Sequence, residues 1–351
     1  MYFFIVWLRN KLFDWNILKS KKFDIPIISV GNITIGGTGK TPHIEHFIKE
    51  ILPKKRVAVL SRGYKRKTSG FVLADENCTA QTIGDEPYQI YKKFPEILVA
   101  VDEKRVRGVE KLLALPNPPE VILLDDAFQH RYILPSTNIL LINYNRPIFS
   151  DKILPYGHLR EPISAIKRAD KVIITKCPKN LSKEEKKYFI ENVNRYRHCG
   201  LDPQSLDDNV IAGLTRNRLK KNDSDHHLNY ENIFFSSFVY STPKNIFTQK
   251  SMDTDIKRDF LVVTGVVDAG GMYDYLQNFA KNIHKMEFAD HHYFTKRDII
   301  KINQKLLTLP ADSLIITTEK DRARLLDNPF ITNELKEKIF YIEINVEIQN
   351  F

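Results

Sequence analysis

The chain of 351 residues has few cysteines, and its N-terminal apolar run is short. The three cysteines, Cys78, Cys177 and Cys199, show no spacing of a metal or redox site, which is typical of a protein from a reducing compartment. The apolar residues 1–8 cannot span a bilayer, since a span takes about 20 residues. We also expect that this run is not a secretory signal, because positive charge follows it instead of preceding it, and no small-residue cleavage site comes after it.

Positive charge is in excess. Lysine and arginine total 53 against 43 acidic residues, which gives a net charge of +10. This excess suggests an anionic partner such as a nucleotide, a nucleic acid or an anionic membrane surface. The length allows a large core and two domains, and a hydrophobic fraction of 42% is ordinary for a globular protein.

The N-terminus combines aromatic residues with basic ones. Phe4, Leu8, Leu12 and Trp15 fall on one side of a helix, although Lys11 intrudes. A helix that lies in a membrane interface has such a face and a basic flank. We favour this interpretation over the alternative, in which the helix packs on the protein's own core.

A glycine-rich segment is the most informative motif. Residues 30–42 (VGNITIGGTGKTP) follow an apolar run and precede a helical pattern. In a phosphate-binding loop, backbone amides and a helix N-terminus hold phosphate oxygens, Lys40 reaches the β- and γ-phosphates, and Thr41 ligates Mg²⁺. The outer glycine is Gly31, so the loop is lengthened; a chance glycine-rich turn is the alternative. The predicted nucleotide-binding residues are Thr34, Ile35, Gly36, Gly37, Thr38, Gly39, Lys40 and Thr41.

Short, continuously apolar runs alternate with helical patterns, as in sheets covered on both faces. We therefore predict an α/β fold: a P-loop NTPase-like, mostly parallel sheet with helices on both faces, plus a smaller C-terminal α/β domain. The predicted strands are Ile25–Val30, Arg56–Leu60, Ile97–Val101, Val121–Asp125, Asn138–Asn143, Lys171–Lys176, Asn232–Tyr240, Phe260–Val266, Lys285–Phe288, Ser313–Thr318 and Lys338–Asn345. Helical patterns in the second half are Met272–Phe279, Lys296–Leu306 and Asp321–Leu326.

Acidic residues lie at two element ends. Asp125 and Asp126 close an apolar strand, where phosphate-loop enzymes place Mg²⁺-binding carboxylates, and helix capping is the alternative role. Asp85 opens a predicted helix after Gly84. It is either a helix N-cap or a carboxylate that accepts a proton from an alcohol.

Histidines and clustered cations follow other strands. The segment Asp290–Tyr293 suggests an acid/base dyad or a metal site, and we favour the dyad because further ligands at suitable spacing are missing. Surface histidines near a helix cap are the alternative. The cationic segments 61–67 and 104–107 are either solvated or anion-binding, and their positions after strands favour anion binding.

Two other functional classes remain open from the residues alone. A GTP-driven switch would read guanine with Thr175 and Lys176, although guanine readers typically carry an Asn-Lys pair and a later Asp. A nucleotide-dependent nucleic-acid-binding protein would use the +10 charge. However, the sequence has no helix-turn-helix, RNA-recognition motif or zinc module, so we predict no nucleic-acid partner.

Taken in order along the chain, the motifs resemble those of the tetraacyldisaccharide 4'-kinases, or lipid A 4'-kinases. The resemblance covers about residues 25–322. Each motif alone is weak, but their shared order is specific. The motifs are residues 30–42, 61–64, 84–87, 124–126 with 128–130, 156–162, 288–291 and 317–321.

This resemblance implies a kinase that uses ATP and Mg²⁺ to phosphorylate the 4'-hydroxyl of a tetraacyldisaccharide 1-phosphate, giving lipid IVA in lipid A biosynthesis. Its partners would be ATP, the acylated disaccharide 1-phosphate lipid and the inner-membrane surface. It would be peripheral, on the cytoplasmic face of the bacterial inner membrane. The implied site residues are Asp85, His291 and Lys40 in catalysis; Thr41, Asp125 and Asp126 at the metal; Arg62 and Arg105 on the substrate; and Glu161 at the nucleotide.

We predict four segments. Residues 1–22 form a membrane-associating helix, residues 23–197 a P-loop kinase domain, and residues 229–351 a smaller α/β domain. Residues 198–228 are polar and rich in turn residues, and they resemble translated mobile palindromic repeats. We predict that they form a surface insertion without a catalytic role, so His226 and His227 are poor metal candidates.

Overall fold

The computed structural model describes residues 2–198, 232–266 and 268–349. The described chain belongs to two compact units. The first is Met1–Ile44, Glu120–Ser237 and Ile348–Phe351, and the second is Glu45–Pro119 and Phe238–Glu347. The predicted insertion lies outside the described residues, apart from residue 198. The domain bounds derived from the sequence remain a prediction beside this division.

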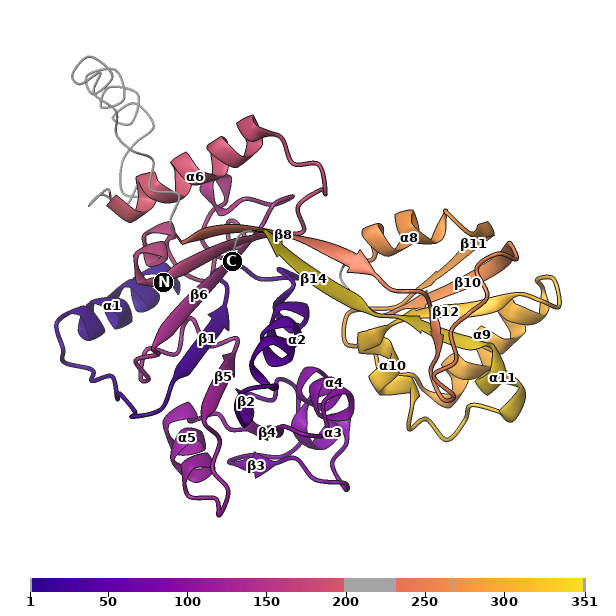
Figure 1. The fold of residues 1–351 in the computed structure, drawn as a ribbon, viewed down its shortest axis with the longest axis horizontal. Helices are drawn as coiled ribbons and strands as arrows, with labels where there is room; N and C mark the ends of the chain where they lie inside the picture. Colours follow the sequence, from indigo (N-terminus) through magenta and orange to yellow (C-terminus); the bar gives the residue numbers. More distant parts are fainter. Residues whose placement is uncertain (1, 199–231, 267, 350–351) are drawn as a thin grey trace. The chain divides into compact units, whose positions relative to one another are not determined.

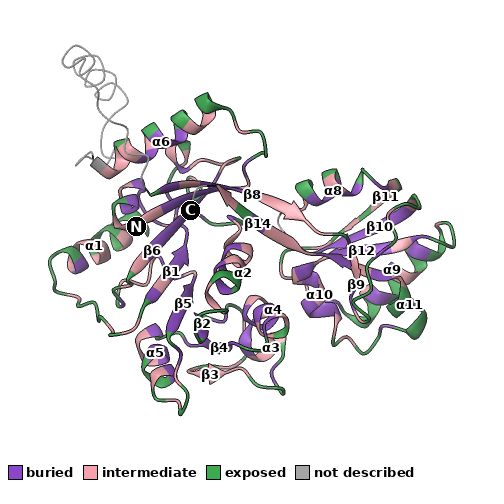
Figure 2. Ribbon diagram, in the orientation of Figure 1, coloured by how far each residue is buried: buried purple, intermediate pink, exposed green. Residues whose placement is uncertain are grey.

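The first unit is built on parallel strands. Along the sheet the order is β8-β7-β6-β1-β5, and each neighbouring pair is parallel. These strands are rich in isoleucine, leucine and valine, and β5 is buried along its whole length (Figure 2). The elements are α1 (Tyr2–Asp14), β1 (Ile27–Gly31), β5 (Val121–Asp125), β6 (Thr137–Asn143), η1 (Ile148–Ser150), η2 (Ile163–Arg168), β7 (Lys171–Thr175), α6 (Lys183–His198) and β8 (Ile233–Tyr240).

The second unit contains a five-stranded sheet in the order β11-β10-β12-β13-β9, in which only β9 is antiparallel to its neighbour. Its other strands pair as β2-β4-β3. The elements are α2 (Lys40–Ile51, which begins in the first unit), β2 (Val57–Ser61), β3 (Val72–Leu73), α3 (Ala80–Ile83), α4 (Asp85–Lys93), β4 (Leu98–Val101), α5 (Arg105–Leu113), β9 (Lys244–Asn245), β10 (Arg258–Thr264), α8 (Gly270–Leu276), β11 (Ala280–Glu287), α9 (Lys296–Leu307), β12 (Leu314–Thr318), α10 (Glu319–Leu325), α11 (Asn333–Lys338), β13 (Ile339–Ile342) and β14 (Ile344–Gln349).

Helices cover both faces of the five-stranded sheet, as Figure 1 shows for α8 and α9. Successive residues of β10 alternate between two cores. Leu261 and Val263 pack with Ile299 of α9, whereas Phe260 and Val262 pack with α8. The predicted α/β fold with a mostly parallel sheet is therefore confirmed.

The sequence does not predict the two-residue strands β3 and β9. Apart from shifts of one or two residues, the predicted strands otherwise differ from the observed ones at two places. The run Lys338–Asn345 is two strands, β13 and β14, separated at Glu343, whose carboxylate lies 3.1 Å from Lys244 Nζ. Strand β11 begins at Ala280, five residues before the predicted start at Lys285. It is the edge strand of its sheet, and an edge strand tolerates polar residues that hide the apolar pattern.

Helix α1 forms where the sequence predicts an N-terminal helix. Its last turn packs on the first unit: Phe13 is 5% exposed and its ring lies 5.0 Å from that of Tyr132. Arg9 also donates hydrogen bonds of 3.1 Å to the carbonyl oxygen of Gln129. In the earlier turns Tyr2, Phe3, Phe4, Ile5, Trp7 and Leu8 are all exposed. Phe4, Ile5 and Leu8 lie on one side of the helix, and we call these three the exposed α1 face. Among the described residues, every helix is too short or too polar to cross a bilayer.

Candidate active site

The glycine-rich segment connects the end of β1 to the start of α2, as predicted. Gly31 ends the strand at a close approach of another segment. A Cβ atom built on it would lie 2.8 Å from Phe128 Cβ and 2.9 Å from Phe128 N, so any larger residue would force the residues after β5 away. The outer glycine of the lengthened loop is therefore required for packing rather than for a turn.

The loop between these elements is held by its carbonyl oxygens. Arg146 donates to the carbonyl of Ile35, and Thr175 Oγ1 donates to that of Thr38 at 2.9 Å. His43 Nδ1 lies 2.7 Å from the carbonyl of Gly39. The Ile35 amide donates to the carbonyl oxygen of His158 at 2.8 Å, so it is not available to a ligand. Because the three carbonyl oxygens face the surrounding protein, the amides of residues 36–39 are the ones that can hold an anion on the other side.

Two glycines of the loop have a backbone conformation that other residues rarely adopt. Gly36 has φ of 92° and Gly39 has φ of 82°. Asn32 Nδ2 donates a 2.7 Å hydrogen bond to Thr38 Oγ1 across the loop. These features fix a curved backbone directly before Lys40, which begins α2. The 12-residue helix adds its positive N-terminal partial charge at this point.

The predicted metal carboxylates lie beside this loop. Asp125 pairs in register with Val30 of β1, so the strand that carries it ends at the same sheet edge as the loop. It is 2% exposed, whereas the side chain of Asp126 is 34% exposed. Lys40 Nζ lies 3.7 Å from Asp126 Oδ1. The structure therefore brings Lys40 and Asp126 together, with Thr41 the next residue of α2.

Arg160 also contacts Asp126. Its Nη2 donates to Asp126 Oδ1 at 2.8 Å and its Nη1 donates to Oδ2 at 3.2 Å. The neighbouring Glu161 is 1% exposed and accepts a hydrogen bond from Arg168. Glu161 is thus fixed by its ion pair with Arg168, and it is next in the sequence to Arg160, the cation that contacts Asp126.

The remaining predicted residues belong to the second unit. Asp85 is the first residue of α4, and the N-cap is Gly84, with φ of 94°. Asp85 is therefore not the helix cap. A Cβ atom on Gly84 would lie 3.2 Å from the carbonyl oxygen of Tyr64, which places the segment after β2 against the start of α4.

Asp85 and His291 are in direct contact. His291 Nδ1 lies 3.0 Å from Asp85 Oδ2, although 206 positions separate the two residues. Both side chains are partly exposed, at 21% and 16%. Burial alone would raise the pKa of Asp85, but the hydrogen bond to His291 and the positive charge of Arg324 together hold it below its ordinary value. Asp85 is therefore ionised at neutral pH.

The two predicted substrate cations differ in exposure. Arg62 is exposed in the segment after β2, next to Gly63 with φ of 70°. Arg105 begins α5 and is 4% exposed, and its Nη1 donates to the carbonyl oxygens of Asp102 at 3.1 Å and Glu103 at 3.3 Å.

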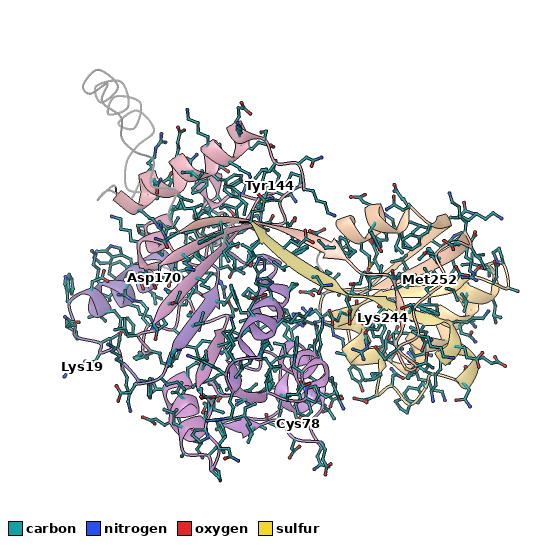
Figure 3. All side chains as sticks on the ribbon, viewed as in Figure 1. Lys19, Cys78, Tyr144, Asp170, Lys244 and Met252 are labelled. Atoms are coloured by element: carbon teal, nitrogen blue, oxygen red, sulfur yellow. The ribbon has the colours of Figure 1, made fainter. Side chains whose placement is uncertain are left out.

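In the described residues, no cluster of three or more histidine, cysteine or acidic residues could hold a metal ion. Cys78, labelled in Figure 3, is a buried free thiol.

Sequence reasoning did not assign three cations of these sites. Arg160 and Lys320 lie inside motifs that carry the resemblance, but no local pattern indicates their partners. Arg324 lies just beyond the last motif and contacts Asp85 from 239 positions away. An arginine on a short helix has no sequence signal that separates this role from a solvated one.

Comparison with known proteins identifies the family. The family model described as LpxK, tetraacyldisaccharide-1-P 4'-kinase, matches residues 1–351. The tetraacyldisaccharide 4'-kinase of Phocaeicola vulgatus is 42% identical over 348 residues, covering 97% of this chain and 86% of its own. That of Bacteroides thetaiotaomicron is 39% identical over 357 residues, covering 98% and 86%.

A solved structure agrees with these relatives. The crystal structure of LpxK from Aquifex aeolicus in complex with ATP superimposes with a TM-score of 0.68 at 28% identity. The match covers 99% of this chain and 92% of that one. The predicted resemblance is thus confirmed over the full length, and the chain belongs to the tetraacyldisaccharide-1-phosphate 4'-kinase family.

Proposed function

We propose that this protein transfers the γ-phosphate of ATP to the 4'-hydroxyl of a tetraacyldisaccharide 1-phosphate, a step of lipid A biosynthesis. One observation carries the proposal: the loop between β1 and α2, with its carbonyl oxygens held from outside and Lys40 at its end. The acceptor follows from the family to which the chain belongs. The test is whether ATP is converted to ADP only when this lipid is present, with GTP as the comparison nucleotide.

The residues suggest how the transfer proceeds. Asp85 accepts the proton of the 4'-hydroxyl, whose oxygen forms the new bond to the γ-phosphorus as the bond to the β–γ bridging oxygen breaks and ADP leaves. His291 orients Asp85. Lys40 stabilises negative charge on the transferred group. Arg62, which is exposed, supplies positive charge for the anionic head group, and the buried Arg105 is the second cation that the resemblance assigns to it.

A Mg²⁺ ion fits the residues beside the loop. The Thr41 hydroxyl and the carboxylates of Asp125 and Asp126 are the hard oxygen ligands that Mg²⁺ prefers. The carboxylate of Asp126 faces two cations, Lys40 and Arg160, in a position where a metal can replace one of them. When bound, Mg²⁺ would neutralise charge on the β- and γ-phosphates.

Substitution of the carboxylates tests this assignment. In Asp125→Ala and Asp126→Ala, we expect the Mg²⁺ concentration for half-maximal activity to rise by about tenfold or more, because an oxygen ligand is lost. The KM for the lipid should stay unchanged. The exposed Asp75 provides a matched control, Asp75→Ala. An unchanged Mg²⁺ dependence in both variants would show that these carboxylates are structural.

We also propose that the exposed α1 face docks on the anionic inner-membrane surface from the cytoplasmic side. The face is apolar, with Phe4 60% and Ile5 56% exposed. Lys19, labelled in Figure 3, is exposed shortly after the helix, as are Lys21 and Lys22. Apolar side chains beside lysines are the combination that binds anionic lipid surfaces reversibly.

Point substitutions test this docking without disturbing Phe13. A variant with Phe4→Ser, Ile5→Ser and Leu8→Ser should bind phosphatidylglycerol vesicles at least about tenfold more weakly, since each buried side chain contributes about 1.5–3 kcal/mol. Cosedimentation measures the bound fraction. The control carries Ile300→Ser and Leu307→Ser, which change exposed apolar residues of α9. Equal vesicle binding by the parent and the α1 variant would refute membrane docking by this face.

A further inference from the structure

Helix α10 carries two cations one turn apart, Lys320 and Arg324, and each contacts one member of the Asp85–His291 pair. We propose that Lys320 and Arg324 are positioning residues that fix which oxygen of Asp85 and which nitrogen of His291 serve the reaction. The inference rests on the proposed function of the pair. It assigns a role to the motif at residues 317–321, which the proposed function leaves unexplained.

Arg324 holds one oxygen of Asp85. Its Nε donates to Asp85 Oδ2 at 2.9 Å, and its Nη2 lies 2.8 Å from the same atom. His291 Nδ1 also contacts Oδ2. In the described part of the chain, the side-chain hydrogen bonds of Asp85 thus all end on Oδ2, so Oδ1 is the oxygen available to a substrate hydroxyl.

Arg324 is itself held in place by Asp321 and Gly265. The guanidinium is 2% exposed, and its Nη1 donates to Asp321 Oδ1 at 2.8 Å and to the carbonyl oxygen of Gly265 at 3.1 Å. Asp321 is fully buried and accepts the Gly265 amide at 2.9 Å. A buried arginine with this many partners has one available orientation. It therefore presents Nε and Nη2 to Asp85 in a fixed position.

His291 is held by the same backbone group, the carbonyl of Gly265. The backbone amide of His291 donates to the Gly265 carbonyl oxygen at 3.3 Å, the atom that also accepts from Arg324. A Cβ atom on Gly265 would lie 3.1 Å from Asp321 Oδ1 and 3.3 Å from the carbonyl oxygen of Ala289. The end of β10 thus sets the histidine and the arginine against Asp85 from one point of the sheet.

Lys320 determines the tautomer of His291. Its Nζ lies 3.3 Å from His291 Nε2. Asp290 Oδ2 lies 3.6 Å from the same nitrogen, beyond hydrogen-bond distance, so Lys320 is the closer partner. An ammonium group can only donate, so in this contact Nε2 accepts, and the proton of a neutral ring is on Nδ1, facing Asp85 Oδ2. Glu86 Oε1 at 3.4 Å and Asp290 Oδ1 at 3.6 Å hold the ammonium group in place.

A buried ion cluster joins α10 to α4, the helix that Asp85 opens. Lys93 of α4 pairs with Glu319 of α10 and lies 2.6 Å from Glu45 Oε2. Both carboxylates are buried, at 6% and 2% exposure. The two helices are therefore connected by side chains that strongly favour a single arrangement.

The charges around the pair define what removal of Arg324 does. Without Arg324, Lys320 would be the remaining cation beside the carboxylates of Asp85, Glu86 and Asp290. The pKa of Asp85 would then rise, because the positive charge of Arg324 helps to lower it. An ionised Asp85 is needed to accept a proton, so activity would be lost at a higher pH on the acid side. The groups that face the pair are Glu86 from α4, Asp290 and Tyr64 from loops, and Lys320, Asp321 and Arg324 from α10.

The experiment compares pH profiles of kcat/KM in the phosphotransfer reaction. For Arg324→Met we expect the acid limb to move up by about one pH unit or more. Arg324→Lys keeps the positive charge but loses the planar guanidinium with its fixed donors. The acid limb of this variant should therefore move less, while its kcat still falls. Arg322→Met is the matched control, because Arg322 stacks over the Tyr341 ring at 4.4 Å instead of facing Asp85. Its profile should equal that of the parent.

A second measurement reports the histidine directly. In protein labelled with ¹⁵N-histidine, the His291 resonances, assigned by their absence in His291→Ala, should show the proton on Nδ1. Lys320→Met should lose that preference and lower kcat more than it changes KM. A proton on Nε2 in the parent would overturn the role of Lys320.

The outcomes separate this inference from the proposed function. An acid limb that stays in place in folded Arg324→Met, while Asp85→Asn is inactive, would overturn the role of Arg324 alone. Full activity of Asp85→Asn would instead reject the proposed base. If circular dichroism shows that Arg324→Met is unfolded, Arg324→Met with Asp321→Asn removes both charges of the buried pair. The same shift is then expected, and its absence would overturn the role.

Discussion

Replacing Lys40 by alanine is expected to lower kcat by about two to three orders of magnitude, because charge stabilisation of the transferred phosphoryl group is lost. Lys40 is the first residue of α2, and its ammonium group faces Asp126 at 3.7 Å. The fold should survive, since the hydrogen bonds that hold the loop come from His43, Arg146 and Thr175. Stopped assays of ADP formation with the lipid acceptor measure the change.

A second lysine of the same helix provides the control for this substitution. Lys49 lies in the last turn of α2, where its Nζ donates to Asn345 Oδ1 at 2.7 Å. Lys49→Ala removes the same charge from the same helix and should leave kcat within about twofold. If Lys40→Ala also retains turnover within about threefold of the parent, the loop is not the phosphate site and the assignment is wrong.

The second large effect is expected at the Asp85–His291 pair. Asp85→Asn and His291→Ala should each reduce kcat by about 10²–10⁴, because proton transfer from the hydroxyl is impaired. The two residues share one hydrogen bond of 3.0 Å, so the double variant should be barely worse than the poorer single one. ATP binding should persist in all three variants, since the loop amides are untouched.

Independent effects would argue against joint action of Asp85 and His291. If the two single losses multiply in the double variant, Asp85 and His291 have separate roles. His292 offers a matched control, because its Nε2 contacts Asp298 at 3.0 Å rather than Asp85. His292→Ala should therefore leave kcat close to that of the parent.

Local patterns predicted the parts of this protein that are set locally. Continuous apolar runs located β1, β5 and β7 to within two residues at each end, because strands covered on both faces need such runs. The glycine pattern located the loop before Lys40, since glycine is required where φ is positive. The resemblance then indicated Asp85 and His291 as partners.

Contacts between distant segments were not accessible to the same reasoning. The ion pair of Arg324 with Asp85 joins residues 239 positions apart, and nothing in either segment encodes the other. Arg160 lies inside a motif of the resemblance, yet its contact with Asp126 depends on the pairing of the neighbouring Leu159 with Thr34 of the loop. The requirement for Gly31 likewise became clear only from the approach of Phe128.

Transfer of phosphate from ATP to the lipid tests the central claim most directly. The purified protein would be incubated with γ-³²P-labelled ATP, Mg²⁺ and a tetraacyldisaccharide 1-phosphate, and the lipid product isolated and analysed by fragmentation mass spectrometry. We expect one labelled phosphate on the 4' oxygen for each ADP formed, and none with Lys40→Ala. ATP hydrolysis without labelled lipid, or phosphate on a different hydroxyl, would contradict the proposed function.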